Sequence, residues 1–101
     1  MNDTTPMTPM TPMTFAAFEA DARAFGFDEV LVRDWPASTV IATHTHPFAA
    51  KALVVAGQMW LTAHGSTRHM HPGDTFELAA GVPHDERYGA EGATYWVARR
   101  G

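Results

Sequence analysis

The sequence contains no cysteine and few basic residues, and each absence removes a class of function. Without thiols, the chain cannot form disulfide frameworks, cysteine nucleophiles, cysteine-ligated zinc sites or iron–sulfur clusters. Seven Lys and Arg stand against eleven Asp and Glu, and the formal charge of -4 has the wrong sign for a surface that neutralises phosphates. We therefore expect no nucleic-acid partner.

Long hydrophobic runs are also missing. The longest, such as residues 52–56, has the size of a strand and falls far short of the roughly 20 apolar residues of a membrane-spanning helix. The N-terminus shows neither the basic segment nor the apolar segment of a secretory signal. We expect a soluble protein with no membrane partner and, by default, a cytoplasmic location.

Several catalytic motifs do not occur. Neither Ser38 nor Ser66 stands in a Gly-X-Ser-X-Gly sequence, and there is no glycine pattern for phosphates or dinucleotides and no His-Glu-X-X-His. These absences argue against serine hydrolase, dinucleotide-dependent and zincin chemistry.

The length of 101 residues and the hydrophobic content of 46% suit one compact domain with one core. Residues 1–13 repeat Thr-Pro-Met, and proline both lacks an amide donor and favours extended neighbours, so we expect a flexible tail. Residues 14–101 are then a single domain.

A short amphipathic helix is predicted over residues 14–25. Thr14 can cap it, Gly26 can end it, and one face carries Phe15, Phe18, Ala22 and Phe25. Since so short a helix is marginal alone, its apolar face must pack on the body of the domain or on a second subunit.

From residue 27 to residue 99 the pattern changes to short β-type runs separated by turn residues. Eight strands are predicted: 29–35, 39–46, 51–56, 58–63, 67–70, 75–79, 84–88 and 93–99. This spacing favours an all-β fold, a small antiparallel β-barrel or jelly roll preceded by the short helix.

Two histidines stand close together in one predicted strand. His44 and His46 are two residues apart, so both side chains point to one face, which is the interior face if Val40 and Ala42 share it. Imidazoles inside a barrel need partners, and these are either a divalent cation or hydrogen bonds within the pair.

Three other histidines are expected outside any site. His69 and His71 form a second His-X-His pair, but this pair runs into the Pro72-Gly73 turn with no third histidine nearby. His64 is predicted to be a hairpin residue beside Gly65.

Residues 73–84 run from a turn through a strand into Gly81-Val82-Pro83-His84. Together with the upstream histidine pair, they resemble the two motifs of the cupin superfamily, G(X)5HXH(X)3-4E(X)6G and G(X)5PXG(X)2H(X)3N. The matching residues are His44, His46 and Gly57 for the first motif, and Gly73, Gly81 and His84 for the second. Ala79 and Tyr88 stand where the family has Pro and often Asn. The resemblance covers roughly residues 28–98.

The resemblance implies a small single-domain cupin in which His44, His46 and His84 bind a divalent transition metal ion such as Fe, Zn, Ni or Mn. The family's fourth ligand, a carboxylate, would fall at Lys51. Because a protonated lysine cannot coordinate, the substitution has two possible consequences. A three-histidine site with open positions remains, or the metal is lost and the site recruits an anion.

Strand alternation from His84 places Glu86 and Tyr88 on the inward face. Glu86 could pair with Lys51 and so satisfy both buried charges, or it could be a replacement ligand, a general base or a solvated surface residue. Lys51 in turn is either an exposed strand lysine or an inward residue that binds an anion or accepts a proton. Phe48 and Tyr88 are expected to line the pocket.

These features favour a metal-dependent enzyme that acts on a small oxygen-bearing or anionic organic molecule, with Lys51 and Glu86 as catalytic residues. An iron site would suit an oxidoreductase of dioxygenase type, whereas zinc or nickel would suit proton transfer or hydrolysis, as in an isomerase or lyase. The alternatives are a non-catalytic sensor that binds a small molecule and a structural homodimer with a vestigial site. Because cupin barrels commonly pair, we expect a homodimer.

Overall fold

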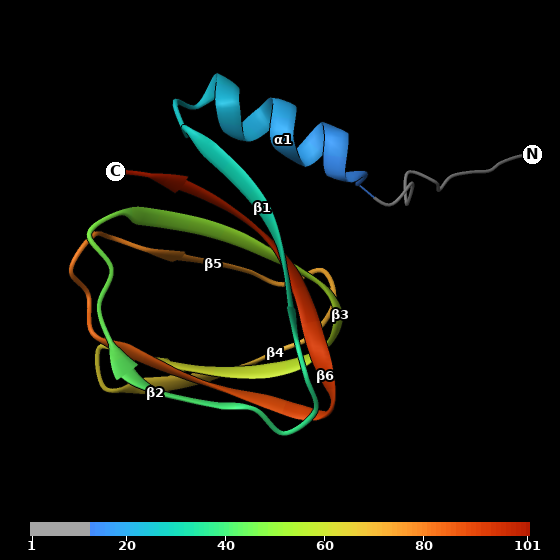
Figure 1. The fold of residues 1–101 in the computed structure, drawn as a ribbon, viewed down its shortest axis with the longest axis vertical. Coiled ribbons are helices and arrows are strands. Elements are labelled where there is room, and N and C mark those ends of the chain that lie inside the picture. The colour runs from blue at the N-terminus through green and yellow to red at the C-terminus, as the bar shows by residue number, and fades with distance from the viewer. Residues whose placement is uncertain (1–12) are drawn as a thin grey trace, which may run out of the picture.

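A computed structural model of the chain describes residues 13–101, which form a closed, two-layered antiparallel β-structure with one helix packed outside it (Figure 1). The elements in chain order are α1 (Phe15–Ala24), β1 (Glu29–Trp35), β2 (Val40–His44), β3 (Ala49–Ala63), β4 (Ser66–Met70), β5 (Thr75–Leu78) and β6 (His84–Arg100). Every strand pair is antiparallel. The predicted all-β jelly roll with a short N-terminal helix is confirmed.

The two longest strands, β3 and β6, run through both layers and pair with each other along nearly their full lengths. The first half of β3 pairs with β5 and with the second half of β6, and β1 covers the other edge of β6. The second half of β3 pairs with β4, and the first half of β6 pairs with β2. The two layers are therefore joined to each other by β3 and β6.

Two predicted strand breaks are wrong. Residues 51–56 and 58–63 belong to one strand, β3, and residues 84–88 and 93–99 belong to one strand, β6. Gly57 and Gly92 have φ of 73° and 74°, and a Cβ on Gly57 would lie 2.1 Å from the Gly92 carbonyl oxygen. Glycine at both positions lets the strands bend closely past each other, so the chain turns a corner here without ending either strand.

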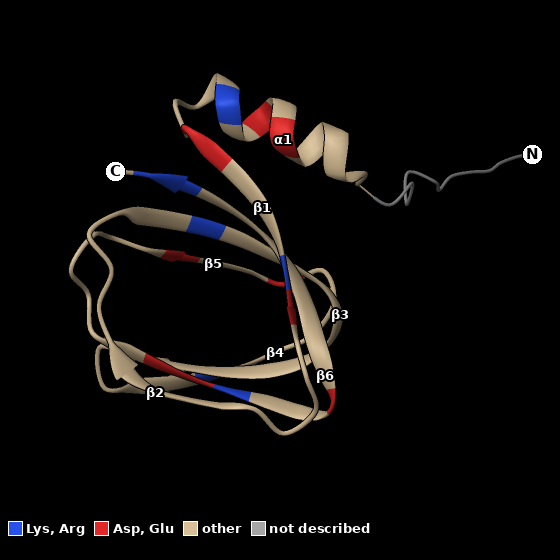
Figure 2. Cartoon of the chain, viewed as in Figure 1, with Lys and Arg blue, Asp and Glu red and all other residues tan. Residues whose placement is uncertain are grey.

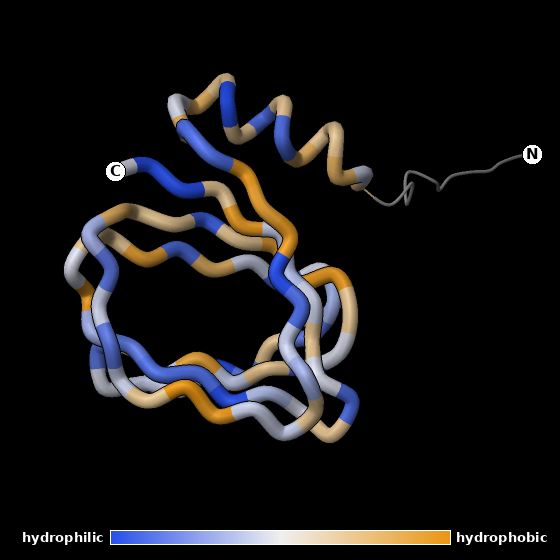
Figure 3. Tube along the Cα trace, viewed as in Figure 1, coloured by the Kyte–Doolittle hydropathy of each residue, from blue (hydrophilic) through white to orange (hydrophobic). Residues whose placement is uncertain are grey.

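The interior of the barrel is built by strand alternation. Along β3, Ala50, Ala52 and Val54 face the core, whereas Lys51 and Leu53 lie on the opposite face. Figure 3 shows hydrophilic and hydrophobic residues mixed along the strands. The same two-residue period decides which polar side chains reach the interior.

The helix packs on the outer surface of the barrel. The Thr14 hydroxyl accepts a hydrogen bond from the Ala17 amide at 3.1 Å and caps the helix, as predicted. Phe18 and Ala22 are buried against Ala98 of β6, so the helix packs on the body of its own domain. No helix within residues 13–101 is long and apolar enough to cross a membrane.

Phe25 departs from the prediction that placed it on the buried face of the helix. It is 72% exposed, because it caps the C-terminus of α1 and no longer follows the helical period. The Thr-Pro-Met segment predicted as a flexible tail lies, up to residue 12, outside the described residues.

Candidate metal centre

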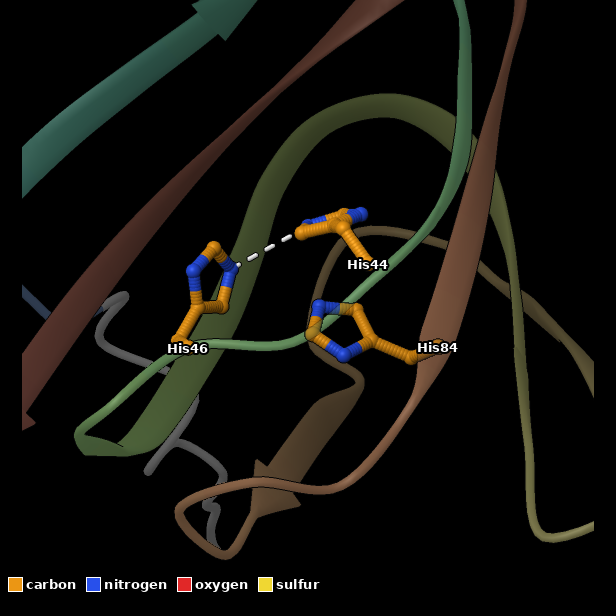
Figure 4. Close-up of side chains that lie close together, drawn as sticks. All are labelled: His44, His46 and His84. Atoms are coloured by element: carbon orange, nitrogen blue, oxygen red, sulfur yellow. Dashed lines mark hydrogen bonds between the residues drawn. The ribbon is translucent and has the colours of Figure 1, made fainter.

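Three histidines from separate segments converge on the inner surface of the barrel (Figure 4). His44 ends β2, His46 follows it in the link to β3, and His84 begins β6. His44 and His84 are also direct partners in the β2–β6 pair. One nitrogen from each ring lies within 4.8 Å of the others, so the pairing of β2 with β6 assembles the cluster that the sequence motifs predict.

Backbone carbonyls orient two of the rings. Nδ1 of His44 lies 2.8 Å from the Ala42 carbonyl oxygen, and Nδ1 of His84 lies 2.9 Å from that of Val82. Since a carbonyl oxygen only accepts, each Nδ1 carries the proton and each Nε2 keeps a free lone pair. This is the arrangement that holds a metal-binding imidazole in place.

The spacing of the nitrogens also suits a metal ion. Nε2 of His44 lies 3.2 Å from Nε2 of His46. Two nitrogens bound at tetrahedral angles to one zinc ion would be about 3.3 Å apart, given zinc–nitrogen bonds of about 2.0–2.1 Å. The pair therefore needs little rearrangement to share an ion.

His46 is held in its neutral form. Burial lowers its pKa, and the neighbouring His44 and His84 lower it further. Its ring stacks on Phe48, with ring centroids 4.7 Å apart. A neutral imidazole is the form that coordinates a metal, so the surroundings of His46 favour a ligand role.

Glu86 places a carboxylate beside the histidines. It is only 5% exposed, and its Oε2 lies 3.5 Å from Nε2 of His84 and 3.7 Å from Nε2 of His44. Among residues 13–101, no lysine or arginine forms an ion pair with it. A buried carboxylate is costly without a compensating charge, and a divalent cation among the imidazoles would supply that charge. The donor set therefore fits a divalent metal ion.

Two buried tyrosines lie near this carboxylate. The Tyr88 hydroxyl donates a hydrogen bond to Oε1 of Glu86, and the Trp35 indole donates one to the Tyr95 hydroxyl at 3.3 Å. Burial raises the pKa of both tyrosines, so both hydroxyls keep their protons as hydrogen-bond donors. Tyr88 was predicted to line the pocket, but it is not among the residues that line the cavity, and its hydroxyl contacts Glu86 instead.

The three histidines and Glu86 line one end of a cavity of about 240 Å³. This volume is below the roughly 300–1,000 Å³ of sites for drug-sized ligands, so it suits a small molecule. Its apolar walls include Phe48, Phe76, Leu78 and Val97. Phe48 thus lies where the sequence places it.

Comparison with known proteins identifies the family. Residues 30–98 match the family model described as Cupin domain. The chain belongs to the cupin family. Among curated proteins, no sequence gives a significant match.

Several solved cupin structures share the fold. A DMSP lyase, DddQ, from Ruegeria pomeroyi DSS-3 is 27% identical with a TM-score of 0.66, and the match covers 71% of this chain but only 37% of that one. KdgF from Halomonas sp. is 19% identical, with a TM-score of 0.61 and coverage of 71% and 68%. A structure concerned with the Mn(II) centres of Bacillus subtilis oxalate decarboxylase is 20% identical, with a TM-score of 0.65 and coverage of 75% and 22%. The chain thus spans little more than a third of the DMSP lyase.

The predicted pairing of Lys51 with Glu86 is wrong for this cupin. Lys51 lies on the outer face of β3, in a groove beside α1, with its Nζ 5.5 Å from the centroid of the Phe25 ring. Strand alternation turns the neighbouring Ala50 into the cavity, where it offers no ligand atom. The carboxylate nearest the histidines therefore comes from β6, as Glu86, and not from β3.

Sequence reasoning missed two cationic residues of the cupin cavity, Arg33 of β1 and Arg99 of β6. A signal for Arg33 was present, because alternation in β1 places it on the same face as Leu31 and Trp35. One basic residue in an otherwise apolar inward row indicates a polar function at that point.

Proposed function

We propose that this cupin is a metal-dependent enzyme in which His44, His46 and His84 bind one divalent transition metal ion. The proposal is carried by the convergence of three ring nitrogens within 4.8 Å, beside a buried carboxylate with which no lysine or arginine among residues 13–101 forms an ion pair. The metal is one of Fe, Zn, Ni or Mn, since imidazole nitrogen suits Fe, Zn and Ni, and the nearby carboxylate of Glu86 suits Mn.

The residues of the site define what the reaction requires. A divalent ion bound by these residues would act as a Lewis acid and polarise an oxygen atom of the ligand. The three histidines leave coordination positions open, while Glu86 is close enough to complete the ligand set or to take a proton from a bound molecule. Tyr88 fixes the orientation of Glu86 through its hydroxyl.

The size of the cavity and its partly apolar walls restrict the substrate to a small oxygen-bearing organic molecule. Lyase or oxidoreductase chemistry is favoured. The structural neighbours include a DMSP lyase, whose name agrees with the lyase option, and an oxalate decarboxylase with Mn(II) centres, which shares the fold. These names describe the neighbours, and fold similarity alone does not transfer a reaction.

Metal analysis tests the proposal most simply. Protein purified without chelator, and metal-free protein titrated separately with Mn²⁺, Fe²⁺, Ni²⁺ and Zn²⁺, should take up one ion per chain. Turnover of small organic acids should then depend on that ion and disappear with a chelator. A chain that takes up none of the four ions would contradict the proposal.

Two alternatives remain predictions. A sensor without catalysis would retain a bound metabolite unchanged during incubation with the metal-loaded protein. A structural homodimer with a vestigial site would pair without binding metal. Light scattering measures the predicted homodimer in either case.

A further inference from the structure

The candidate metal centre shares its cavity with two arginines. Although the chain carries a formal charge of -4, the cavity is lined by Arg33 and Arg99 and by one acidic residue, Glu86. Figure 2 shows that the other charged residues are spread over the helix and the strands. A bound divalent ion would make the cavity still more positive, which favours an anionic ligand.

Arg33 is an exposed residue of β1, and its side chain is available for a ligand. It is paired in register with Tyr95, so both side chains lie on the inner face of the β1–β6 pair, and both line the cavity. Its guanidinium forms no hydrogen bond or ion pair with any residue in the range 13–101. A guanidinium presents a rigid fork of donors that matches a carboxylate.

Arg99 differs from Arg33 because its charge is already compensated. Its Nε donates to Oε1 of Glu29 at 3.0 Å, and its Nη2 donates to the same oxygen. Its guanidinium also lies over the Phe48 ring, 4.5 Å from the centroid. Arg99 is therefore held in place, and it contributes less to the binding of a new anion.

The apolar residues of the cavity indicate the chemistry of the rest of the ligand. Phe48, Phe76, Leu78 and Val97 supply apolar surface to the same cavity, and Phe48 contacts both His46 and Arg99. A fully charged, compact ion such as phosphate would leave this surface without a partner. A short carbon chain ending in a carboxylate would use both the apolar surface and the free guanidinium.

We propose that Arg33 is the anion-recognition residue of this cavity and that the ligand is a short organic acid, bound by its carboxylate. This inference rests on the proposed function, because it assigns the substrate class of the same site. In this assignment Arg33 holds the carboxylate, and the rest of the molecule lies in the cavity that His44, His46 and His84 also line.

The test compares three probes on metal-free and Zn²⁺-loaded protein by calorimetry: butyrate, its neutral amide butyramide, and inorganic phosphate. Butyrate should bind best. Arg33→Gln should weaken butyrate binding about tenfold or more, the loss expected for a charge-assisted hydrogen bond. Arg99→Gln should weaken it less. Arg87→Gln is the matched control, since Arg87 lies over Trp60 and away from the cavity, and it should leave binding unchanged.

Several results would overturn the inference. They are the absence of saturable butyrate binding, equal affinity for butyrate and butyramide, tighter binding of phosphate than of butyrate, and an Arg33→Gln protein that binds butyrate like wild type. Zn²⁺ affinity, measured on the same proteins, separates this failure from failure of the proposed function. If the protein binds Zn²⁺ but Arg33→Gln does not weaken butyrate binding, only the inference about Arg33 is contradicted. If butyrate binding depends on Arg33 but the protein binds no metal, only the metal proposal is contradicted.

Discussion

The chain contains two His-X-His pairs, and the structure gives them different surroundings. His44 and His46 lie inside the barrel, where His84 and Glu86 come within reach from β6. His69 and His71 form the other pair, called the outer pair below, and His44 and His46 form the inner pair. The His69 ring stacks on Trp60 with centroids 4.4 Å apart, and its Nε2 lies 2.6 Å from the Gln58 amide oxygen. No third histidine joins this outer pair among residues 13–101.

The difference shows that the motif alone does not make a metal centre. Both pairs have rings close together, with centroids 4.7 Å apart in the inner pair and 4.2 Å apart in the outer pair. What distinguishes the inner pair is a third ring delivered by strand pairing and a carboxylate shielded from water. At the outer pair, His71 has Asp74 nearby, but both of these side chains are well exposed.

The largest effect expected from this comparison is on metal affinity. His84→Gln removes the ligand that only the inner pair has, and we expect the affinity for Zn²⁺ or Mn²⁺ to fall at least about 100-fold. His69→Gln, the matched change at the outer pair, should leave the affinity unchanged. Calorimetric titration measures both, and circular dichroism checks the fold. Equal losses in the two variants would remove the distinction between the pairs.

The second largest effect on metal affinity is expected from substitution of Glu86. Glu86→Gln keeps the size of the side chain but removes the charge that balances the ion, so metal affinity should fall about 10–100-fold. Glu77→Gln on β5, an exposed position, is the control and should bind metal like wild type. If Glu86→Gln binds metal as tightly as wild type, the carboxylate has no part in the site.

A third ligand added to the outer pair should give that pair the ability to bind a metal ion as well. Gln58 already contacts His69, so Gln58→His places an imidazole next to His69 and His71. We expect the bound Zn²⁺ to rise from one to two ions per chain, with the second ion held more weakly because the outer site is exposed to water. The double variant Gln58→His, His69→Gln should return to one ion. A single ion in the Gln58→His protein would contradict the argument.

The smallest effect is on stability against acid. Since burial lowers the pKa of His46 in the folded protein, the unfolded chain takes up a proton at its ordinary value of 6.5 while the folded chain resists it. The free energy of unfolding of the metal-free protein should therefore decrease as the pH falls below about 6.5. Urea titrations at pH 7.5 to 5 would measure the slope, which should be smaller in His46→Gln. An unchanged slope would mean that His46 does not contribute.

Strand alternation predicted one part of the site and failed for another, because β2 ends at His44, before His46, and Val40, which was expected on the inward face, is 70% exposed. His44, His46 and His84 carry family motifs, and alternation from His84 put Glu86 on the inward face, where the structure has it buried. Lys51 could not be placed in the same way, because its position was taken from the spacing of a motif. The four-residue spacing to Lys51 is one residue out of phase with β3, whereas the three-residue spacing that the motif also allows reaches Ala50, which faces inward.

Other features depend on contacts between distant segments. Gly57 could be taken as the end of a strand, because its close approach to Gly92 exists only after the two strands pair. The role of Arg33 depends in the same way on β1 closing over the cavity beside β6. Local patterns predicted the strands and their faces, whereas the bends and the charges of the cavity are set by tertiary pairing.

The most direct test of the metal centre is a crystal structure of the Mn²⁺-loaded or Zn²⁺-loaded protein, with diffraction data collected at the absorption edge of the metal. The account predicts one anomalous peak per chain, about 2.0–2.3 Å from the Nε2 atoms of His44, His46 and His84. A peak at His69 and His71, or no peak within the barrel, would contradict it.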